Sequence, residues 1–411
     1  MREILYMTRI ALISDIHFGK FSRTKEFSVP GEMLQDKNQG AISLQDGLIK
    51  IFKEMCVNYL FIAGDLTSVA SPQEFHYCEE KIIFIADEVG IPYNHILCCL
   101  GNHDVDRNIT KICDSVIREE TSEEVAKLIR QKYNLIAANC ATTNLETLNI
   151  RGKDMGPAPY SGVYEEDKFI VFLLNSAWNC AHNQDFPHGK LSANQLKWFE
   201  NVSDLFRDDL RIKFVLLHHH PFKYKYPIPS QDISELEEGS EFMDIVRKNK
   251  IDIIIHGHRH HPIAKTIQVD SGTNPVTLIC AGSLSVNSQH RNGGDIPNTM
   301  HILELEENSR SYVLYNYKYT SSEGWVPLIF TNAAPLDHKM KLGKLFTIEQ
   351  IEDAIRKIPV NGKEFVLWDD LDTCLQYITY NELNSRISQL LSNEYKIAGK
   401  FPDEVFLKKK E

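Results

Sequence analysis

Five short apolar runs of the sequence each end in residues that could bind a metal ion or transfer a proton. In α/β proteins, functional groups gather where the strands end, because the carboxyl ends of parallel strands lie along one edge of the sheet. These run ends therefore predict one shared site. Its residues stand in five segments: Asp15-Ile16-His17, Gly64-Asp65, Gly101-Asn102-His103-Asp104, His218-His219-His220-Pro221 and His256-Gly257-His258-Arg259-His260.

The side chains in these segments are carboxylates, imidazoles and one amide, and this ligand set suits Mn, Fe or Zn. In Asp15-x-His17 and His258-x-His260, residues i and i+2 of an extended chain would project to the same side and reach one ion. Asp65 follows a glycine, whose backbone can turn tightly, so we expect its carboxylate to bridge two ions. Two ions roughly 3.5–4 Å apart would polarise a phosphoryl group and convert a bridging water into hydroxide near neutral pH.

Each segment taken alone also has an ordinary structural interpretation. A Gly-Asp pair is common in turns, and neighbouring histidines can pack against one another in a loop. A chance set of polar residues would fall in loops and helices as well as at strand ends. The joint occurrence of all five segments at strand ends therefore favours a two-metal site.

Short β-rich runs alternate with amphipathic helical segments along most of the chain. Most of the runs are continuously apolar, as strands buried on both faces are, and the alternation predicts an α/β layered fold. The expected strands are residues 9–14, 59–63, 96–100, 169–175, 212–217, 251–255 and 276–280. The expected helices are about residues 43–57, 72–88, 123–133, 192–206 and 241–249. Residues 300–305 and 311–317 are expected to close the fold as an antiparallel pair.

Two segments fall outside this alternation. Residues 18–40 form a long polar stretch, and a loop of that length in a compact domain is usually functional or disordered. After about residue 320 the pattern becomes mostly helical, with helices expected at 348–357 and 380–391. We therefore predict a catalytic domain over residues 1–319 and a mostly helical C-terminal appendage over residues 320–411. The appendage could form a homo-oligomer, cover the site as a lid or dock a partner.

The composition is that of a soluble globular protein: 43% of the 411 residues are hydrophobic and 25% are charged, with a formal net charge of −11. The sequence has no dense basic stripe, which disfavours a general nucleic-acid-coating protein. No apolar run reaches the ~18 residues that span a bilayer, and the first residues predict a strand and not a signal peptide. The nine cysteines include no Cys-x-x-Cys pair, which favours reduced thiols in a cytoplasmic protein.

The order of the motifs resembles that of the calcineurin-like metallophosphoesterase superfamily over about residues 8–317. This resemblance implies an α/β fold of the four-layer α/β/β/α type, with two divalent metal ions (Mn, Fe or Zn) at the sheet edge. It also implies that His103 donates a proton to the leaving oxygen and that Asp104 orients His103. One implied metal site consists of Asp15, His17, Asp65 and His260, and the other of Asp65, Asn102, His218 and His258.

Further segments are similar to the class III cyclic-nucleotide and glycerophosphodiester phosphodiesterases. These segments are 186–192 (FPHGKLS), 195–198 (QLKW) and 218–221 (HHHP). Alignment of Pro221 with the last proline of that HHxP pattern makes His218 the ligand and His219 the alternative. Otherwise His219 would face substrate or pack structurally, and His188 would line the pocket or be an ordinary loop histidine. The branch usually has an aspartate where this chain has Asn175.

The resemblance implies an enzyme that hydrolyses a phosphodiester, cyclic-nucleotide-like or other, by attack of a metal-bound hydroxide with His103 as proton donor. A metal-dependent nuclease is an alternative, because residues 14–20 (SDIHFGK) resemble the first motif of DNA-repair exonucleases, but the acidic net charge disfavours a nucleic-acid partner. A catalytically weak regulatory or scaffolding module is another alternative, although all seven ligand positions are filled. A phosphate-ester substrate is thus the expected partner, and no membrane partner is expected.

Overall fold

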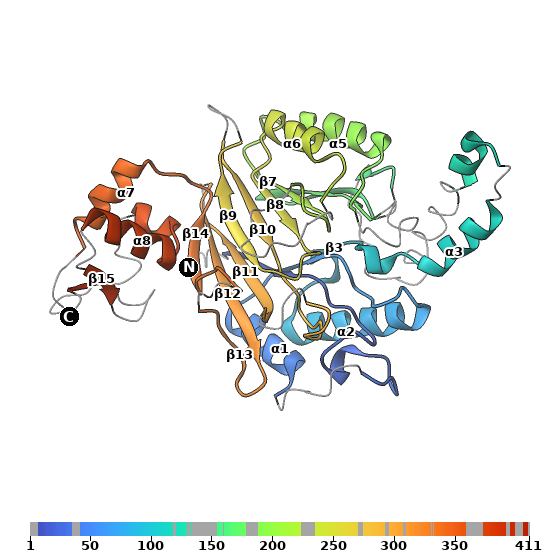
Figure 1. The fold of residues 1–411 in the computed structure, drawn as a ribbon, viewed down its shortest axis with the longest axis horizontal. Coiled ribbons are helices and arrows are strands. Elements are labelled where there is room, and N and C mark those ends of the chain that lie inside the picture. The colour runs from blue at the N-terminus through green and yellow to red at the C-terminus, as the bar shows by residue number, and fades with distance from the viewer. Residues whose placement is uncertain are drawn as a thin grey trace, which may run out of the picture.

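The computed structural model consists of two large β-sheets with helices outside them (Figure 1). The residues that it describes are 7–34, 42–117, 121–129, 132, 154–158, 160–177, 188–222, 235–269, 274–291, 296–306, 310–329, 331, 333–358, 373–391, 395–398 and 406–409. Part of the long polar segment 18–40 and part of the expected helix 123–133 lie outside these residues. Residues 123–129 are helical as expected.

The first sheet contains the N-terminal strand and has the order β13-β12-β11-β1-β2-β3, with β14 paired to β12. Its strands are β1 Thr8–Ile13, β2 Tyr59–Ala63, β3 Ile96–Cys99, β11 Asn298–Leu305, β12 Tyr312–Thr320, β13 Gly324–Pro327 and β14 Lys339–Leu342. Strands β1, β2 and β3 run parallel, and β11 lies antiparallel to β1. The expected antiparallel pair of the later segments is confirmed in β11 and β12.

The second sheet has the order β4-β5-β6-β7-β8-β10-β9. Its strands are β4 Asp154–Met155, β5 Gly162–Glu165, β6 Phe169–Leu173, β7 Ile212–Leu216, β8 Ile253–His256, β9 Ile263–Ile267 and β10 Val276–Cys280. Strands β6, β7, β8 and β10 are parallel neighbours. Their carboxyl ends therefore share one edge of the sheet, and the loops that follow them can build one site.

Alternate residues of β1 show how the layers pack. Ile10 and Leu12 are buried in the core between the two sheets, whereas Ala11 and Ile13 belong to the core beneath the helices of the first sheet. Successive side chains of a strand point to opposite faces, so both faces of this sheet are covered. In the second sheet, Val171 likewise faces the first sheet while its neighbours face their own helices. The expected four-layer α/β/β/α arrangement is confirmed.

Two pairs of helices form the outer layers, and a further helix extends from the sandwich after β3 (Figure 1). These helices are α1 Leu44–Glu54 and α2 Pro72–Val89 on the first sheet, α5 Ala193–Leu205 and α6 Gly239–Lys248 on the second, and α3 Arg107–Val116. A capping box formed by Ser71 and Glu74 begins α2, and Gly90 ends it in a left-handed conformation. Among the helices that the structure describes, none has the length and apolar character needed to cross a bilayer.

The chain beyond residue 320 starts within the first sheet. Both β13 and β14 pair with β12, so we propose that the catalytic domain ends after Leu342 and not at residue 319. The elements that follow are α7 Ile348–Ile355, η5 Thr373–Tyr377, α8 Tyr380–Leu390, β15 Tyr395–Ala398 and β16 Phe406–Lys409. The helices among them share a small apolar core of their own and lie at one end of the molecule (Figure 1).

Candidate metal centre

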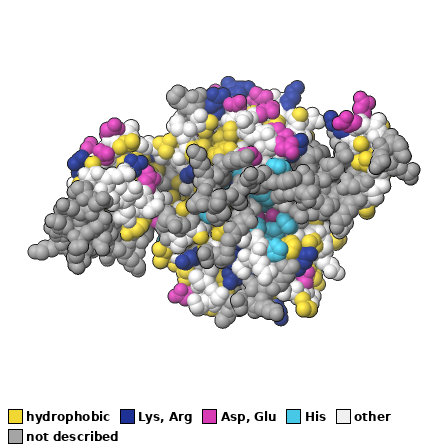
Figure 2. All heavy atoms as spheres, in the orientation of Figure 1, with side chains coloured by type: hydrophobic (Ala, Val, Ile, Leu, Met, Phe, Trp, Pro, Cys, Tyr) yellow, Lys and Arg dark blue, Asp and Glu magenta, His cyan; other side chains and the backbone are white. Residues whose placement is uncertain are grey.

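The candidate site lies where strands of both sheets end. Asp15, Asp65 and Asn102 come shortly after β1, β2 and β3 of the first sheet, and His218 and His258 come after β7 and β8 of the second. Histidine side chains gather near the middle of the molecular face in Figure 2. The fold therefore combines the strand-end residues of two separate sheets in one site.

Asp15, His17, Asp65 and His260 form a first cluster, in which the candidate ligand atoms lie within 4.8 Å of one another. His17 Nε2 is 3.2 Å from Asp65 Oδ2, and His260 Nε2 is 3.0 Å from Asp15 Oδ1. All four side chains are buried. Within the described part of the chain, neither Asp15 Oδ1 nor the ring nitrogens of His17 make a well-aligned hydrogen bond. Buried polar atoms are costly without a partner, so this cluster fits a divalent cation.

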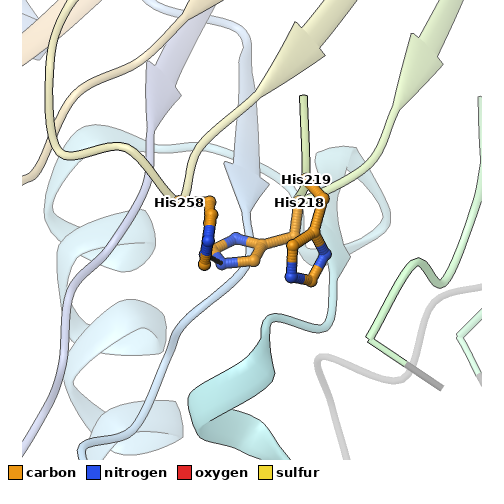
Figure 3. A group of neighbouring side chains, drawn as sticks. All are labelled: His218, His219 and His258. Atoms are coloured by element: carbon orange, nitrogen blue, oxygen red, sulfur yellow. Dashed lines mark hydrogen bonds between the residues drawn. The ribbon is translucent and has the colours of Figure 1, made fainter. Parts of the chain in front are cut away.

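His218, His219 and His258 form a second cluster of the same dimension (Figure 3). Figure 3 shows that the first two rings come from the segment after β7 and the third from the turn after β8. Asn102 Oδ1 lies 2.9 Å from His258 Nδ1 and 3.2 Å from His218 Nε2. The structure thus brings three implied ligands together and adds His219, whose Nδ1 lies 2.9 Å from the hydroxyl oxygen of Ser176.

Asp65 lies between the two clusters. Its Oδ2 atom is 3.2 Å from His17 Nε2 and also 3.2 Å from His218 Nε2. Its Oδ1 atom accepts a hydrogen bond from the backbone N–H of His103 at 2.8 Å, which holds the carboxylate in place. One oxygen is therefore held by the backbone while the other is close to both clusters, as a bridging ligand requires.

The backbone at the site is left-handed where an extended chain was expected. Positive φ angles occur at Asp15 (50°), His17 (47°), Asp65 (52°), His258 (69°) and His260 (54°). The interpretation that both pairs reach one ion from an extended chain is therefore wrong: Asp15 and His17 lie in one cluster, but His258 and His260 lie in different clusters. The side chains converge because the chain turns after each strand. Such conformations cost non-glycine residues about 1–3 kcal/mol each and are concentrated at functional sites.

Glycines allow these turning segments to approach one another. Gly64 has a φ of 86°, and a Cβ atom there would lie 2.6 Å from His218 Nδ1. This close packing leaves His218 Nδ1 2.7 Å from the carbonyl oxygen of Ala63, to which it can donate a hydrogen bond. The opposite ring nitrogen, Nε2, is then the one available to a metal ion. A Cβ atom at Gly101 would overlap the Asp65 carboxylate.

Opposite charges hold His17, His218 and Asp65 in their ionised forms. Burial lowers the pKa of His17, but the adjacent carboxylates of Asp15 and Asp65 outweigh it and raise the pKa to about 9. Burial also opposes protonation of His218, yet the charge of Asp65 raises its pKa to about 9. For Asp65 itself, burial raises the pKa, but the neighbouring histidines hold it well below the usual value. A divalent ion could therefore take the place of the protons that His17 and His218 carry beside these carboxylates.

At His219 and His258, burial is not outweighed by neighbouring carboxylates. It is the dominant cause at both residues, and it lowers the pKa of each imidazole well below the usual value. Both rings are consequently neutral near pH 7. Neutral imidazole is the form that binds metal ions.

His103 follows β3 in the short helix η3 (Asn102–Asp104). Its Nδ1 atom lies 2.8 Å from the carbonyl oxygen of Ser68, so Nδ1–H donates to that oxygen. The His103 ring also contacts the His17 ring edge-on, with centroids 4.5 Å apart. The carbonyl group of Ser68 therefore orients the His103 ring beside the first cluster.

Asp104 holds the loops that surround His103. Its carboxylate accepts hydrogen bonds from the backbone N–H groups of Leu66, Thr67 and Gly101, at 2.9–3.1 Å. Burial, reinforced by the charge of Asp65, raises the pKa of Asp104 to about 6. The contacts of Asp104 thus fix the backbone on both sides of the site. The His103 ring, which Asp104 was expected to orient, is held by its hydrogen bond to the carbonyl oxygen of Ser68.

The other predicted substrate residue, His188, lies outside both clusters as the described residues form them. Gly189 packs so closely on His219 that a Cβ atom would overlap that side chain, which places the segment beside the second cluster. The segment that precedes His188 lies outside the described residues. Ser176 was not predicted, although it follows β6 and thus has the same strand-end position as the other site residues.

A cavity of about 440 Å³ opens beside His103. Its lining consists of Lys20, Phe21, Ser68, Val69, His103, Val105 and Asn108. The first two of these residues belong to the long polar segment 18–40. Sequence reasoning marked that segment as unusual but did not identify these two residues as part of the site.

Comparison with known proteins identifies the family of the chain. A family model described as calcineurin-like phosphoesterase matches residues 8–262. The chain therefore belongs to the calcineurin-like phosphoesterase family. That family usually binds two divalent metal ions and acts on phosphate esters, and the Asp and His clusters described here could hold such ions. Family and site together support a phosphoester hydrolase.

Individual relatives are distant. The chain is 19% identical over 408 residues to an uncharacterized metallophosphoesterase-like protein, YydB, of Bacillus subtilis (strain 168), covering 96% of this chain and 76% of that protein. It is similar to a dimetal phosphatase from Danio rerio, with 14% identity, a TM-score of 0.45 and coverage of 75% of this chain and 95% of that chain. It is also similar to a purple acid phosphatase from yellow lupin seeds, with 13% identity, a TM-score of 0.47 and coverage of 82% and 54%.

Proposed function

We propose that the protein is a metal-dependent phosphodiesterase in which Asp65 would bridge two divalent ions. The observation that carries this proposal is the position of Asp65 Oδ2, 3.2 Å from a ring nitrogen of each cluster. The remaining ligands would be Asp15, His17 and His260 for one ion and Asn102, His218 and His258 for the other. Carboxylate, imidazole and amide ligands suit Mn, Fe or Zn. Bound ions would supply an activated water and would neutralise charge at the phosphoryl oxygens.

His103 would protonate the leaving oxygen. Its Nδ1–H is committed to the carbonyl oxygen of Ser68, so Nε2 is the atom that can carry the transferable proton. Asp104 would act as a positioning residue, because it holds the loops on which Asp65 and His103 stand. The preference for a diester rests on the similarity of segments 186–192 and 218–221 to the class III phosphodiesterases.

The test compares three substrates with the Mn²⁺-loaded protein: bis(p-nitrophenyl) phosphate, p-nitrophenyl phosphate and a dinucleoside monophosphate. Wild-type protein should hydrolyse both diesters faster than the monoester, and Asp65→Ala should abolish turnover while the protein remains folded by circular dichroism. Turnover of the monoester alone would identify a phosphatase. Diester turnover that persists in Asp65→Ala would contradict the bridging role.

The role of His103 can be separated from that of the metal ligands by the leaving group. General acid catalysis contributes roughly 10²–10⁴-fold, but p-nitrophenolate departs without protonation. His103→Ala should therefore impair dinucleoside monophosphate hydrolysis far more than bis(p-nitrophenyl) phosphate hydrolysis. His76→Ala is the matched control, because His76 is exposed on α2. Equal losses for both substrates would contradict the proton-donor assignment.

We also propose that the protein works in the cytoplasm. The six cysteines that the structure describes form no disulfide, and five of them are buried. Disulfides persist mainly in oxidising compartments, so this pattern suits a reducing one. Cell fractionation with immunodetection tests the location, and recovery outside the cytoplasmic fraction would contradict it.

A further inference from the structure

Another cavity, of about 340 Å³, lies at the opposite end of β8 from the candidate metal centre. Asp252, which lines this cavity, directly precedes β8, whereas His258 of the second cluster follows the carboxyl end of the same strand. The cavity is therefore separate from the metal centre and from the cavity beside His103. Its volume falls within the range of small-molecule pockets, which is roughly 300–1,000 Å³.

The lining of this cavity comes from both sheets and from the segment between β14 and α7. Gln268 and Asn274 belong to the connection between β9 and β10 of the second sheet, and Tyr312 lies in β12 of the first. Phe346 follows β14, and its ring packs against that of Tyr377 with centroids 5.2 Å apart. A molecule bound here would thus contact both sheets and the start of the C-terminal appendage.

The charged groups at the cavity have an excess of positive charge. Among the described residues that line it, Arg310 and Lys344 are cationic and Asp252 is anionic. Asp252 is only 2% exposed, and its Oδ1 atom is 3.0 Å from Arg310 Nη1. Glu306, directly after β11, pairs with Lys341 of β14 at 3.2 Å. The carboxylates in this region are thus already paired.

The buried Lys213 adds a further positive charge behind Asp252. Its backbone N–H donates to Asp252 Oδ2 at 2.9 Å, and its Nζ donates to the carbonyl oxygen of Asp209, also at 2.9 Å. Burial raises the pKa of Asp252, and the charges of Arg310 and Lys213 oppose that rise. One buried carboxylate therefore faces two cations, and buried charge is costly unless it is balanced.

Arg310 can bind a second acceptor besides Asp252. A guanidinium group has five N–H donors, and the ion pair with Asp252 involves one terminal nitrogen. Because the Arg310 side chain is 33% exposed, its other donors can reach a ligand. Gln268 and Asn274 offer amides, which a neutral polyol could also use. A polyol would leave the excess positive charge unbalanced, whereas an anion would balance it.

We propose that this cavity binds a small organic anion, with its carboxylate or phosphate group between Arg310 and Lys344 and its apolar part against Leu345 and Phe346. Such a ligand links the two sheets to the C-terminal appendage. The proposal is independent of the proposed function, because no residue of the candidate metal centre takes part in it.

The test compares two probes of the same shape, naphthalene-1-sulfonate and naphthalene-1-sulfonamide, by equilibrium dialysis against the whole Mn²⁺-loaded chain. The first probe is anionic and the second is neutral, and sulfonates bind metal ions weakly. A hydrogen bond to a charged group contributes about tenfold in affinity or more. Wild-type protein should therefore bind the sulfonate at least about tenfold more tightly. Equal affinities, or a preference for the sulfonamide, would overturn the proposal.

Substitutions of Lys344 test whether the sulfonate binds in this cavity. Lys344→Met should weaken sulfonate binding about two- to fivefold, as the loss of an exposed charge pair does. Lys344→Glu should weaken it further, and Lys344→Arg should retain it. Lys197→Met is the matched control, because Lys197 is exposed on α5 and does not line the cavity. Equal losses in Lys344→Met and Lys197→Met, or unchanged binding in Lys344→Glu, would overturn the proposal.

Two further measurements separate this site from the metal centre and identify the anionic group. Asp65→Ala should leave sulfonate binding unchanged, and loss of binding in that variant would place the probe at the metal centre and overturn the proposal. Benzoate and phenylphosphonate should compete with the bound sulfonate. Stronger competition by benzoate would support a carboxylate ligand, and stronger competition by phenylphosphonate a phosphate ligand. Competition by neither would overturn the proposal.

Discussion

Binding of two metal ions should release about two protons per chain at pH 7. Burial lowers the pKa of His17 and His218, but their carboxylate partners outweigh it and raise both values to about 9. At pH 7 such an imidazole is about 99% protonated, and only its neutral form can bind a metal ion. Protonation should therefore weaken the apparent affinity of each cluster about 100-fold at pH 7, and the affinity should rise about tenfold per pH unit up to pH 9.

Isothermal titration calorimetry of the metal-free protein with Mn²⁺, in two buffers of different ionisation enthalpy, measures this release. His17→Asn and His218→Asn should each lower it by about one proton. His76→Asn should leave the release unchanged, because that side chain is exposed on α2. Release of less than about half a proton by the wild-type protein would refute the reasoning, since the imidazoles would then be neutral before the metal ion binds.

The same shifts determine how the stability of the metal-free protein depends on pH. The folded-state pKa values of His17 and His218 lie above the ordinary value of 6.5. The folded state therefore binds more protons than the unfolded state between these limits, and stability falls as pH rises. The stabilisation should be fully present below pH 6.5 and lost as pH rises through about 9. Urea unfolding in the presence of a chelator at pH 6.5 and 9 measures the change.

Three substitutions test the supporting structure. Asp104→Ala should destabilise the protein by roughly 3 kcal/mol or more, because three backbone N–H groups lose their acceptor; unchanged urea unfolding would contradict this. Asp337→Asn should be more stable than wild type at pH 7, because burial raises the pKa of Asp337 from 3.8 to about 6. Between pH 4 and 7, the free energy of unfolding of the wild-type protein should fall by up to about 3 kcal/mol relative to that of this variant. An equal change in both proteins across that range would refute the prediction. Gly64→Ala should weaken Mn²⁺ binding measured by calorimetry, because its Cβ atom would lie 2.6 Å from His218 Nδ1; wild-type affinity would show that the ring can move aside.

Much of the architecture could be predicted from the sequence because both sheets are built from continuously apolar runs. Residues such as Ile62 and Phe61 pack on opposite faces of one sheet, so neither face shows a polar alternation. Polar residues follow these apolar runs in the sequence, where the strands end at an edge of the sheet. Because the parallel strands of one sheet share an edge, Asp15, Asp65 and Asn102 could be expected in one site, whereas His218 and His258 reach that site from the second sheet.

The local geometry could not be predicted in the same way. The spacing of Asp15 and His17 matched an extended chain, but positive φ angles at both residues bring them together by a turn. That turn depends on backbone hydrogen bonds to Gly64 and Asp65 of the neighbouring strand end. Contacts of this kind join segments far apart in sequence and leave no local pattern.

Long-range contacts also explain the two remaining differences. Strands β13 and β14 are short, and only their pairing with β12 places them in the first sheet. Phe21 lies in a segment with no periodic pattern, and it is the contacts with His290 and His103 that assign it to the site. The candidate metal ligands could thus be predicted from their chemistry, whereas the cavity beside His103 required the folded structure.

The central claim is that two ions share Asp65 and that the reaction needs both. The measurement that tests it most directly is a titration of the metal-free protein with Mn²⁺ in which bound ions and bis(p-nitrophenyl) phosphate turnover are followed together. We predict that turnover appears only as the second ion binds, with two ions per chain at saturation, and that Asp65→Asn shows neither the second ion nor turnover. Full turnover with one ion per chain, or in the presence of a chelator, would contradict the claim.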